Sequence, residues 1–275
     1  MSSDTINARE PRAMTTARSF QNKTVLVTGA GGGIGRAAAL AFAHEGANVV
    51  IADLDEVNGA ESLRLIESEG GNGLFVSVDV TENASVEAMV KSVVLRYGRL
   101  DCAFNNAGIA IKGAPIADMD EIVFDRIMAV NAKGVWLCMK YELRQMLAQG
   151  GGAIVNIGSI ASFSGMSAVR SGPSVSSAYI TSKHAVVGLT RAAAMEYAKD
   201  NIRVNAVCPG AVHTPMFERM LQRTPSVGEA SANMHPMGRI AQSTEIADAV
   251  VWLCSDRARF VTGHMLAVDG GFGAA

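Results

Sequence analysis

The sequence predicts a single α/β domain in which helices cover both faces of a seven-stranded parallel sheet. Three observations predict this doubly wound architecture: seven short apolar runs recur along the chain, helical stretches alternate with them, and a glycine-rich turn follows the first run. Runs that are apolar throughout are typical of strands buried on both faces, and alternating strands and helices connect by right-handed crossovers. The chain has 275 residues and no linker-like stretch in its middle, which favours one large domain.

Each element is predicted from its local sequence. The strands are expected where apolar and β-branched residues cluster, at 24–27, 48–52, 74–78, 100–104, 153–157, 203–207 and 265–268. The helices are expected between them, at 36–45, 57–68, 85–97, 124–148, 178–198 and 244–254. Residues 1–22 are polar, and we interpret them as a flexible extension before a domain that spans residues 23–275.

Composition and charge narrow the function classes. Hydrophobic residues make up 49% of the chain and charged residues 18%, which is enough apolar content for a sizeable core. The net charge of -2 predicts neither a nucleic-acid nor a membrane partner, because both usually require a clustered basic surface. The four cysteines stand far apart without a Cys-x-x-Cys pair, so reduced thiols are expected and neither a zinc site nor a disulfide framework.

The amino-terminal residues carry no apolar run of the secretory type, and no transmembrane segment follows. The cytoplasm is therefore the expected location. A transit peptide within residues 1–22 is the alternative, although Asp4, Glu10 and Pro11 interrupt an amphipathic pattern, and Met14 could equally be an alternative start.

The glycine-rich turn lies between the first predicted strand and the first predicted helix. Backbone amides and a helix N terminus in this context accept a pyrophosphate, so the turn is a candidate nucleotide site. Its candidate residues are Gly29, Gly31, Gly33, Ile34 and Gly35. The spacing is wider than Gly-x-Gly-x-x-Gly, and tight turns also select glycine for their own conformational reasons. The strand–turn–helix context makes the motif informative.

Asp53 ends the second predicted strand, 18 residues beyond Gly35. A carboxylate at this place would accept hydrogen bonds from both adenosine ribose hydroxyls and repel a 2′-phosphate. Position 32 is glycine and position 54 is leucine, so neither supplies an Arg or Lys beside the expected 2′-position. These features predict NAD rather than NADP, with helix capping by Asp53 as the alternative.

Tyr179 and Lys183 stand four residues apart within the predicted helix 178–198. Residues at this spacing share a helix face, so the ammonium can lie close to the phenol and favour its ionised form. A free tyrosine titrates near ~10, too high for efficient proton transfer at neutral pH. With the glycine-rich turn, the pair predicts a nucleotide-binding oxidoreductase with a tyrosine acid/base. An exposed amphipathic helix face is the alternative interpretation.

Further short motifs occur in one consistent order. They are Thr28-Gly-x-x-x-Gly-Ile-Gly35, Asp79-Val80, Asn105-Asn106-Ala107-Gly108, Asn131, Ser159, Tyr179-x-x-x-Lys183 and Pro209-Gly210. In this order and spacing the chain resembles the short-chain dehydrogenase/reductase family, from about residue 20 to the end. The resemblance implies a single Rossmann-like domain and a nicotinamide cofactor.

The resemblance also implies the catalytic roles. Tyr179 matches the general acid/base, and Lys183 matches the lysine that lowers the tyrosine pKa and binds the nicotinamide ribose. Ser159 matches the serine that orients and polarises the carbonyl, with a loop or cap serine as the alternative. Asn131 matches the asparagine that holds a water in a proton relay.

The remaining cofactor contacts are implied around the adenine, along its ribose and beside the nicotinamide. They are Asp79 and Val80 for the adenine, Leu54 beside Asp53, Asn106, Ala107 and Gly108 for the ribose, and Pro209, Gly210, Val212 and Thr214 for the nicotinamide. Asn105 is expected to brace neighbouring strands, and the Val212 backbone to meet the carboxamide. A homotetramer is implied, with interfaces around 124–148, 178–198 and 263–272.

Two segments are expected to shape the substrate site. Ser159 and Tyr179 are 20 residues apart, more than the family's usual spacing, so the loop within 160–178 should bulge at the mouth of the site. Residues 213–238 are rich in methionine and are interpreted as a flexible apolar lid. A hydrophobic or alicyclic substrate is therefore expected, although these methionines could equally pack only against the protein.

The predicted function is NAD-dependent oxidation of a secondary alcohol to a ketone and its reverse, by hydride transfer and without a metal. A 3-oxoacyl thioester reductase is one alternative, which the absence of a basic 2′-phosphate site disfavours. A catalytically inactive NAD-binding sensor or scaffold on the same fold is the other. The complete set of Asn131, Ser159, Tyr179 and Lys183 disfavours this last interpretation.

Overall fold

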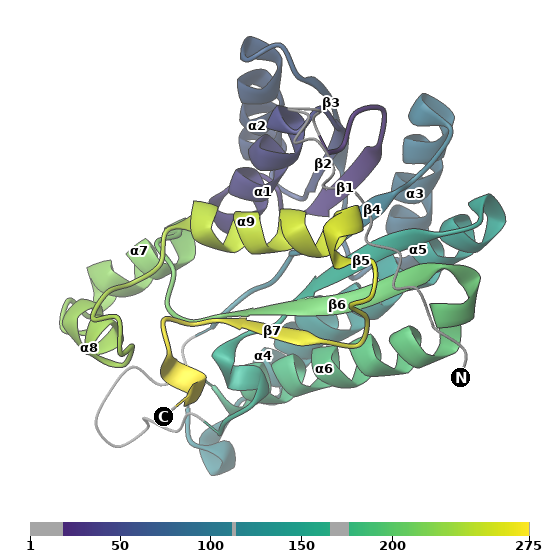
Figure 1. The fold of residues 1–275 in the computed structure, drawn as a ribbon. Coiled ribbons are helices and arrows are strands. Elements are labelled where there is room, and N and C mark those ends of the chain that lie inside the picture. The colour runs from purple at the N-terminus through teal and green to yellow at the C-terminus, as the bar shows by residue number, and fades with distance from the viewer. Residues whose placement is uncertain (1–18, 112–113, 166–175, 275) are drawn as a thin grey trace, which may run out of the picture.

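The computed structural model describes residues 19–111, 114–165 and 176–274. Within them a sheet of seven parallel strands runs in the order β3-β2-β1-β4-β5-β6-β7, with helices on both faces (Figure 1). The strands are β1 (Thr24–Thr28), β2 (Asn48–Asp53), β3 (Asn72–Ser77), β4 (Cys102–Asn105), β5 (Gly152–Ile157), β6 (Ile202–Pro209) and β7 (Met265–Val268). The predicted doubly wound α/β architecture is confirmed. Strand order reverses between β1 and β4, the place where such sheets bind ligands.

The helices occupy most of the predicted stretches. They are α1 (Gly33–His44), α2 (Glu56–Ser68), α3 (Asn83–Tyr97), α4 (Glu121–Met128), α5 (Val135–Gln149), α6 (Ser177–Tyr197), α7 (Pro215–Arg223), α8 (Val227–Asn233) and α9 (Ser243–Cys254). Short 3-10 turns are η1 (Ile116–Asp118), η3 (Ile160–Ser162), η4 (Ala198–Asp200), η5 (Asp256–Ala258) and η6 (Phe272–Ala274). Helix α1 begins three residues earlier than predicted, inside the glycine-rich turn.

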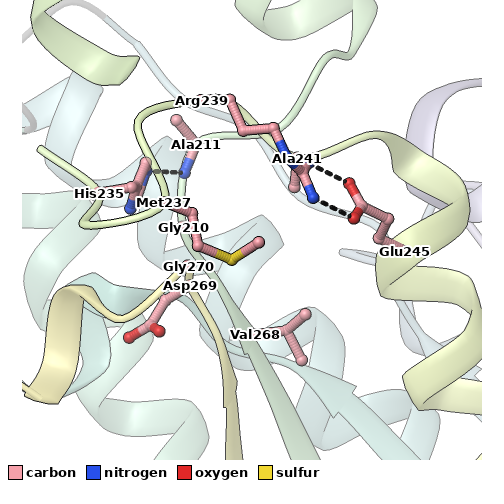
Figure 2. Close-up of a pocket in the computed structure, with 10 residues that line it drawn as sticks. All are labelled: Gly210, Ala211, His235, Met237, Arg239, Ala241, Glu245, Val268, Asp269 and Gly270. Carbon is pink, nitrogen blue, oxygen red and sulfur yellow. Dashed lines mark hydrogen bonds and ion pairs between the residues drawn. The ribbon is translucent and has the colours of Figure 1, made fainter. Parts of the chain in front are cut away.

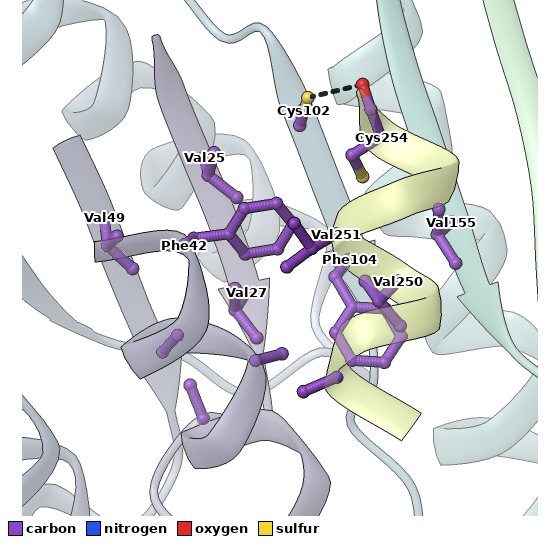
Figure 3. Close-up of a cluster of buried hydrophobic side chains, with 14 of the residues drawn as sticks. Val25, Val27, Phe42, Val49, Cys102, Phe104, Val155, Val250, Val251 and Cys254 are labelled. Carbon is purple, nitrogen blue, oxygen red and sulfur yellow. Dashed lines mark hydrogen bonds between the residues drawn. The ribbon is translucent and has the colours of Figure 1, made fainter. Parts of the chain in front are cut away.

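Two apolar clusters hold the helices to the sheet. One joins α1, α2 and α9 to one face, and Phe42, Phe104 and Val250 are completely buried in it (Figure 3). The other joins α3, α5 and α6 to the opposite face around Leu26 and Met146. A fully buried side chain of this size contributes about 1.5–3 kcal/mol, so the two clusters make the sheet a rigid platform.

The expectation of seven fully apolar strands is wrong at the two edges. Every residue of β1 and β4 is buried, whereas β3 and β7 are only partly buried. An edge strand has a neighbour on one side only, and its faces are covered less completely by helices. Residues 100 and 101, expected in a strand, precede β4 instead. Asp101 there accepts a hydrogen bond from the Thr24 amide at 2.8 Å.

The helix expected at 124–148 is present, and it contains a π-helical segment that was not predicted. The structure has α4, then a π-helical segment η2 (Ala129–Gly134), then α5. A π turn inserts one extra residue into the helical ladder, and such insertions concentrate at functional sites. Hydrophobic periodicity does not report a single inserted residue. Asn131, a candidate catalytic residue, lies in this segment.

The folded domain begins before residue 23. Phe20 is buried and packs edge-on against Phe42, with ring centroids 5.0 Å apart. Its amide donates to the Glu45 carbonyl at 3.0 Å, and its carbonyl accepts from the Lys23 amide at 2.9 Å. The predicted boundary at residue 22 is therefore too late, because one aromatic residue in a polar segment supplies a long-range contact. Residues 1–18 of the predicted extension lie outside the described part.

Candidate active site

The candidate residues gather along one edge of the sheet, at the carboxyl ends of the strands. The glycine-rich turn follows β1, Asp53 ends β2, and Asn106 follows β4. Ser159 follows β5, and the segment that holds Val212 and Thr214 follows β6. Parallel strands place all their carboxyl ends at one edge, so residues almost 190 positions apart meet there.

Tyr179 and Lys183 lie on the first turns of α6, as predicted. Ser176 caps this helix by accepting a hydrogen bond from the Tyr179 amide at 3.2 Å, which sets the position of Tyr179 in the first turn. The Lys183 ammonium lies 5.5 Å from the centre of the Tyr179 ring and donates to the Ile157 carbonyl at 2.9 Å. The end of β5 thus holds the lysine against the tyrosine.

The pKa values differ from the prediction for this pair. Burial raises the pKa of Tyr179, and a hydrogen bond with Ser159 opposes that rise without overcoming it. The expected lowering of the tyrosine pKa by Lys183 is therefore wrong for the protein alone. Burial also lowers the pKa of Lys183 to about 8. Desolvation disfavours the charged forms of both groups, and it is the largest cause of the pKa shift in each.

Ser159 lies directly beyond β5 and combines two roles that were expected to be alternatives. It caps η3, where its hydroxyl accepts from the Ala161 amide at 3.1 Å and its own amide donates to Ser162 Oγ at 3.1 Å. Its side chain also acts on the Tyr179 phenol and opposes the rise in the Tyr179 pKa. The cap fixes the hydroxyl beside the phenol, where a carbonyl oxygen could reach both groups.

Asn131 is buried in the π-helical segment and is locked by three hydrogen bonds. Its Oδ1 accepts from the Ile109 amide at 2.8 Å, and its Nδ2 donates to the Ile109 carbonyl at 2.9 Å and to Ser182 Oγ at 3.2 Å. The side chain therefore joins the loop after β4 to α6. A Cβ added to Gly108 would lie 3.4 Å from Asn131 Oδ1 and 3.9 Å from Lys183 Nζ, so all three residues are neighbours.

The glycine-rich turn has the features that a pyrophosphate requires. Gly32 precedes α1 and offers no side-chain cap, which leaves the first amides of the helix open to a ligand. Gly29 adopts a φ of +64°, and a Cβ there would lie 2.8 Å from Ala107 Cα. Only glycine allows the turn after β1 to approach the turn after β4 this closely. These residues fit a dinucleotide.

Asn106 fastens the same two turns together. Its side-chain amide donates to the Thr28 carbonyl at 3.1 Å and to the Gly29 carbonyl at 3.0 Å. Its role is structural within the turn, and Ala107 and Gly108 carry the backbone past the site. Asn105 braces strands as expected, because its amide donates to Asn156 Oδ1 on β5 at 3.0 Å.

Asp53 lies beside the glycine-rich turn and does not cap α2. Its Oδ2 accepts from the Gly31 amide at 2.7 Å and its Oδ1 from the Asp55 amide at 2.9 Å, whereas the cap of α2 is Asp55. A carboxylate offers about four acceptor positions, so Asp53 can still bind ribose hydroxyls. Leu54, next to it, is 59% exposed.

The structure adds a cation that the local sequence did not reveal. The guanidinium of Arg36 hydrogen-bonds the Gly31 carbonyl, the Asn58 carbonyl at 3.2 Å and Ser62 Oγ at 2.9 Å. The expectation of no Arg or Lys near the 2′-position considered only positions 32 and 54. One turn of α1 brings Arg36 back beneath the glycine-rich turn, where backbone carbonyls occupy it.

The remaining predicted contacts lie around the same edge. Asp79 Oδ1 accepts from Thr81 Oγ1 at 2.7 Å, and this hydrogen bond lowers the pKa of Asp79. Val80 is buried. Val212 pairs with Ala241 in an isolated parallel bridge. Its hydrogen bonds run from the Ala241 amide to the Ala211 carbonyl and from the His213 amide to the Ala241 carbonyl. The N–H and C=O of Val212 itself therefore point away from Ala241.

His235 holds the turn after β6. Its Nε2 accepts from the Ala211 amide at 3.0 Å beside a cavity of about 90 Å³ (Figure 2). This cavity also contains the ion pair of Arg239 with Glu245. Gly210 is the one predicted cofactor residue that lines this cavity, and none of the four candidate catalytic residues lines it. The cavity is therefore separate from the candidate reaction site.

The predicted lid is more ordered than a flexible segment. Residues 213–238 include α7 and α8, and α7 starts at Pro215 against Gly32 of the glycine-rich turn. Met216 and Met220 on α7 are 38% and 37% exposed. Of the predicted loop at the site mouth, Phe163 is half exposed. The Ser164 hydroxyl donates to the Ile160 carbonyl at 3.3 Å, and residues 166–175 of the loop lie outside the described part.

Two observations concern other kinds of site. Across residues 19–111, 114–165 and 176–274, no group of three His, Cys, Asp or Glu side chains could hold a metal ion. No helix in the described part of the chain combines the length and apolar character that crossing a bilayer requires. The four cysteines are buried and unpaired.

Besides Arg36, sequence reasoning missed Ser182 and Cys208 beside the catalytic residues, and His235 against the turn after β6. Ser182 bridges Asn131 to the Tyr179 carbonyl, to which its Oγ donates at 2.7 Å. Its three-residue spacing from Tyr179 could have revealed it. Cys208 lies beside Gly158, where an added Cβ would be 2.5 Å from its Sγ, and burial raises the pKa of its thiol. His235 had no local signal, because its contact crosses a loop.

Comparisons with known proteins cover nearly the whole described domain. A family model described as enoyl-(acyl carrier protein) reductase matches residues 29–273. The 2,5-dichloro-2,5-cyclohexadiene-1,4-diol dehydrogenase of Sphingobium indicum is 42% identical over 256 residues, which cover 93% of this chain and 98% of that protein. The cis-4-hydroxycyclohexanecarboxylate dehydrogenase of Sinomonas cyclohexanicum has the same identity, 42% over 256 residues, and the same coverage, 93% and 98%.

Solved structures agree with these relatives. The crystal structure of levodione reductase matches with a TM-score of 0.87 at 37% identity, covering 93% of this chain and 99% of that one. A structure from Agrobacterium tumefaciens with bound NADP matches with a TM-score of 0.84 at 34% identity, covering 95% and 100%. The fold is therefore shared with both solved structures, one of which holds bound NADP.

Proposed function

Because this chain belongs to the short-chain dehydrogenase/reductase family, we propose that it is an NAD-dependent dehydrogenase that interconverts a cyclic secondary alcohol and its ketone. Its relatives include two dehydrogenases of cyclic alcohols and a reductase, and they support an alcohol/ketone oxidoreductase with a nicotinamide cofactor. The observation that carries the proposal is the convergence of Ser159, Tyr179 and Lys183: the Ser159 side chain acts on the Tyr179 phenol, and the Lys183 ammonium lies 5.5 Å from the centre of the Tyr179 ring. Three elements, η3, α6 and β5, hold these groups at one point.

The mechanism follows from this arrangement. When bound, the nicotinamide ring accepts or supplies the hydride. Ser159 and Tyr179 would together hold the substrate oxygen, and Tyr179 would take the alcohol proton in oxidation or return it in reduction. Lys183 would bind the nicotinamide ribose and stabilise charge that develops on the phenol. Asn131 would hold the backbone of Ile109 in place for a water that relays the proton.

Asp53 supports the preference for NAD. Its carboxylate lies against the glycine-rich turn, and Arg36, the nearby cation, already bonds three oxygen atoms. A 2′-phosphate placed there would meet a like charge at close range, and the Arg36 guanidinium nearby is already bonded to protein oxygen atoms. A structural relative holds NADP, so the test of this preference compares both cofactors.

The substitution Asp53→Asn should lower the NAD preference. It removes the negative charge and keeps an oxygen that can accept from the Gly31 amide. We expect the ratio of kcat/KM for NAD to that for NADP to fall at least about tenfold, equivalent to about 1.4 kcal/mol. Asp55→Asn is the matched control, because asparagine caps α2 as well as aspartate does. An unchanged ratio in Asp53→Asn would refute the role of Asp53.

We propose a hydrophobic or alicyclic substrate. Helix α7 begins at the glycine-rich turn and presents Met216 and Met220, and methionine adapts to irregular apolar shapes. The names of the two dehydrogenase relatives refer to hydroxylated six-membered rings, which agrees with this class. Formation of NADH at 340 nm with cyclic, aromatic and aliphatic secondary alcohols tests it. Turnover of 3-oxoacyl thioesters with NADPH alone would favour the alternative.

Truncating the methionines should change the choice of substrate. In Met216→Ala with Met220→Ala, relative kcat/KM values for cyclic and linear alcohols should shift by about tenfold, as an altered apolar pocket surface predicts. Leu95→Ala is the control, since Leu95 is an apolar side chain on α3 that is 90% exposed. Equal relative rates in the double variant and the parent would show that α7 does not contact the substrate.

We also propose a homotetramer in the cytoplasm. Trp136 on α5 and Met195 on α6 are 46% and 85% exposed, which supports a contact between copies through these helices. A hollow of about 320 Å³ between α4 and α6, with Phe124 in its wall, extends the same face. The four buried free thiols fit a reducing compartment. Sedimentation should give the mass of four chains.

A further inference from the structure

A buried polar network lies beneath the active site and contains one carboxyl group. Glu142 on α5 is completely buried, and its Oε2 accepts from Asn105 Nδ2 at 2.9 Å. The same nitrogen donates to Asn156 Oδ1 at 3.0 Å, and Asn156 Nδ2 donates to Thr190 Oγ1 at 3.0 Å. The network therefore joins α5, β4, β5 and α6.

With Glu142 as a carboxylate, the network is short of a hydrogen-bond donor. Two of its oxygen atoms, Asn105 Oδ1 and Glu142 Oε1, are buried and have no hydrogen-bond donor. Both belong to the two side chains that already share the bond from Asn105 Nδ2 to Glu142 Oε2. An amide and a protonated carboxylic acid can form two such bonds side by side, one in each direction. One proton on Glu142 would satisfy both oxygen atoms at once.

We propose that Glu142 is a neutral carboxylic acid that donates its proton to Asn105 Oδ1, and that this pair positions the strand ends carrying the active site. Asn105 ends β4 directly before the Asn106 turn. Asn156 directly precedes Ile157, whose carbonyl holds Lys183. Thr190 lies on α6 with Tyr179. The positioning half of the proposal rests on the proposed function, whereas the protonation half does not.

The surroundings of Glu142 favour the neutral form. Burial raises the pKa of Glu142 to about 8, and the hydrogen bond from Asn105 opposes this rise only in part. No cation in the described part of the chain forms an ion pair with it, and the group that contacts its carboxyl is the Asn105 amide on β4. Behind Asn105 the network continues through the Asn156 amide on β5 to the Thr190 hydroxyl on α6. The other titratable groups on its own helix are Cys138, Lys140, Tyr141 and Arg144. Burial first and Glu142 second raise the pKa of the Cys138 thiol. Lys140 and Arg144 lie over the Tyr141 ring, and the Tyr141 hydroxyl donates to Glu87 on α3 at 3.3 Å.

The proposal predicts a specific pH dependence of stability. Over the range from about pH 4.5 to about pH 8 the unfolded chain loses the Glu142 proton while the folded protein keeps it. The folded state binds more protons there, so the stability of the wild type falls as pH rises through this range and levels off above it. Glu142→Gln keeps a donor and an acceptor but does not titrate.

The test compares thermal unfolding of wild type, Glu142→Gln and Glu142→Leu between about pH 5 and pH 9. The midpoint advantage of Glu142→Gln over wild type should grow by about 5–10 °C between pH 5 and pH 8 and then stay constant. Glu67→Gln, which alters an exposed glutamate on α2, should give a constant difference. A constant difference for Glu142→Gln as well would overturn the neutral acid.

Two further readouts separate the halves of the proposal. Infrared spectroscopy at about pH 6 should show the C=O band of a protonated carboxyl that is absent from Glu142→Gln; its absence from the wild type would overturn protonation. For positioning, kcat should fall at least about tenfold in Glu142→Leu and return to within about twofold of wild type in Glu142→Gln. Wild-type kcat in folded Glu142→Leu would overturn the positioning role. The unfolding and infrared results need no substrate, so they stand even if the proposed function fails.

Discussion

Tyr179→Phe should abolish nearly all turnover while leaving the protein folded and able to bind NADH. The phenol hydroxyl is the group placed to exchange a proton with the substrate oxygen beside Ser159. The Lys183 nitrogen lies 5.5 Å from the centre of the Tyr179 ring. General acid–base catalysis contributes about 10²–10⁴-fold, and kcat should fall by that amount. Phenylalanine keeps the ring and its packing, so the loss reports the hydroxyl alone.

The measurement is NADH formation at 340 nm with the best cyclic alcohol, together with NADH binding followed by fluorescence. Tyr197→Phe is the matched control, because Tyr197 lies on the same helix and is also partly buried. Its kcat should stay within about twofold of wild type. If Tyr179→Phe keeps more than about a tenth of the activity, another group is the acid/base. Tight NADH binding without any turnover by the wild type would favour an inactive sensor or scaffold.

Lys183→Met should have opposite effects on activity and stability. Burial lowers the Lys183 pKa from its ordinary 10.5 to about 8, which corresponds to a cost of about 3 kcal/mol for keeping the ammonium in the folded protein at pH 7. Methionine removes this cost and loses the hydrogen bond to the Ile157 carbonyl, worth about 1 kcal/mol. The free energy of unfolding should therefore rise by about 2 kcal/mol, while kcat falls at least about 10²-fold.

The pH dependence of this gain has a defined sign. Between about pH 8 and pH 10.5 the unfolded chain binds the Lys183 proton and the folded protein does not, so wild-type stability rises with pH across this range. The advantage of Lys183→Met should be largest below about pH 8 and should fade above it. Denaturant unfolding at several pH values measures this, with Lys199→Met as the exposed control. A Lys183→Met variant less stable than wild type at pH 7 would contradict the burial cost.

Expectations from sequence succeeded where a pattern is local. Apolar runs indicated seven strands because a strand buried on both faces admits few polar side chains. The spacing of Tyr179 and Lys183 indicated a shared helix face, and the glycine-rich turn indicated a close approach of backbone. The prediction of a lowered tyrosine pKa failed because it counted the attraction of Lys183 and left out desolvation, which depends on everything packed around the pair.

The amino-acid sequence by itself determined the α/β fold, the family and the residue types at the strand ends, because these follow from periodicity and from short motifs along the chain. Only the tertiary structure decided how those residues meet. It brought Arg36 under the glycine-rich turn, His235 against the Ala211 amide, and Glu142 beside Asn105 without a cation. Burial and long-range hydrogen bonds join groups from separate elements, so charge states and positions at the site arise only once the chain is packed.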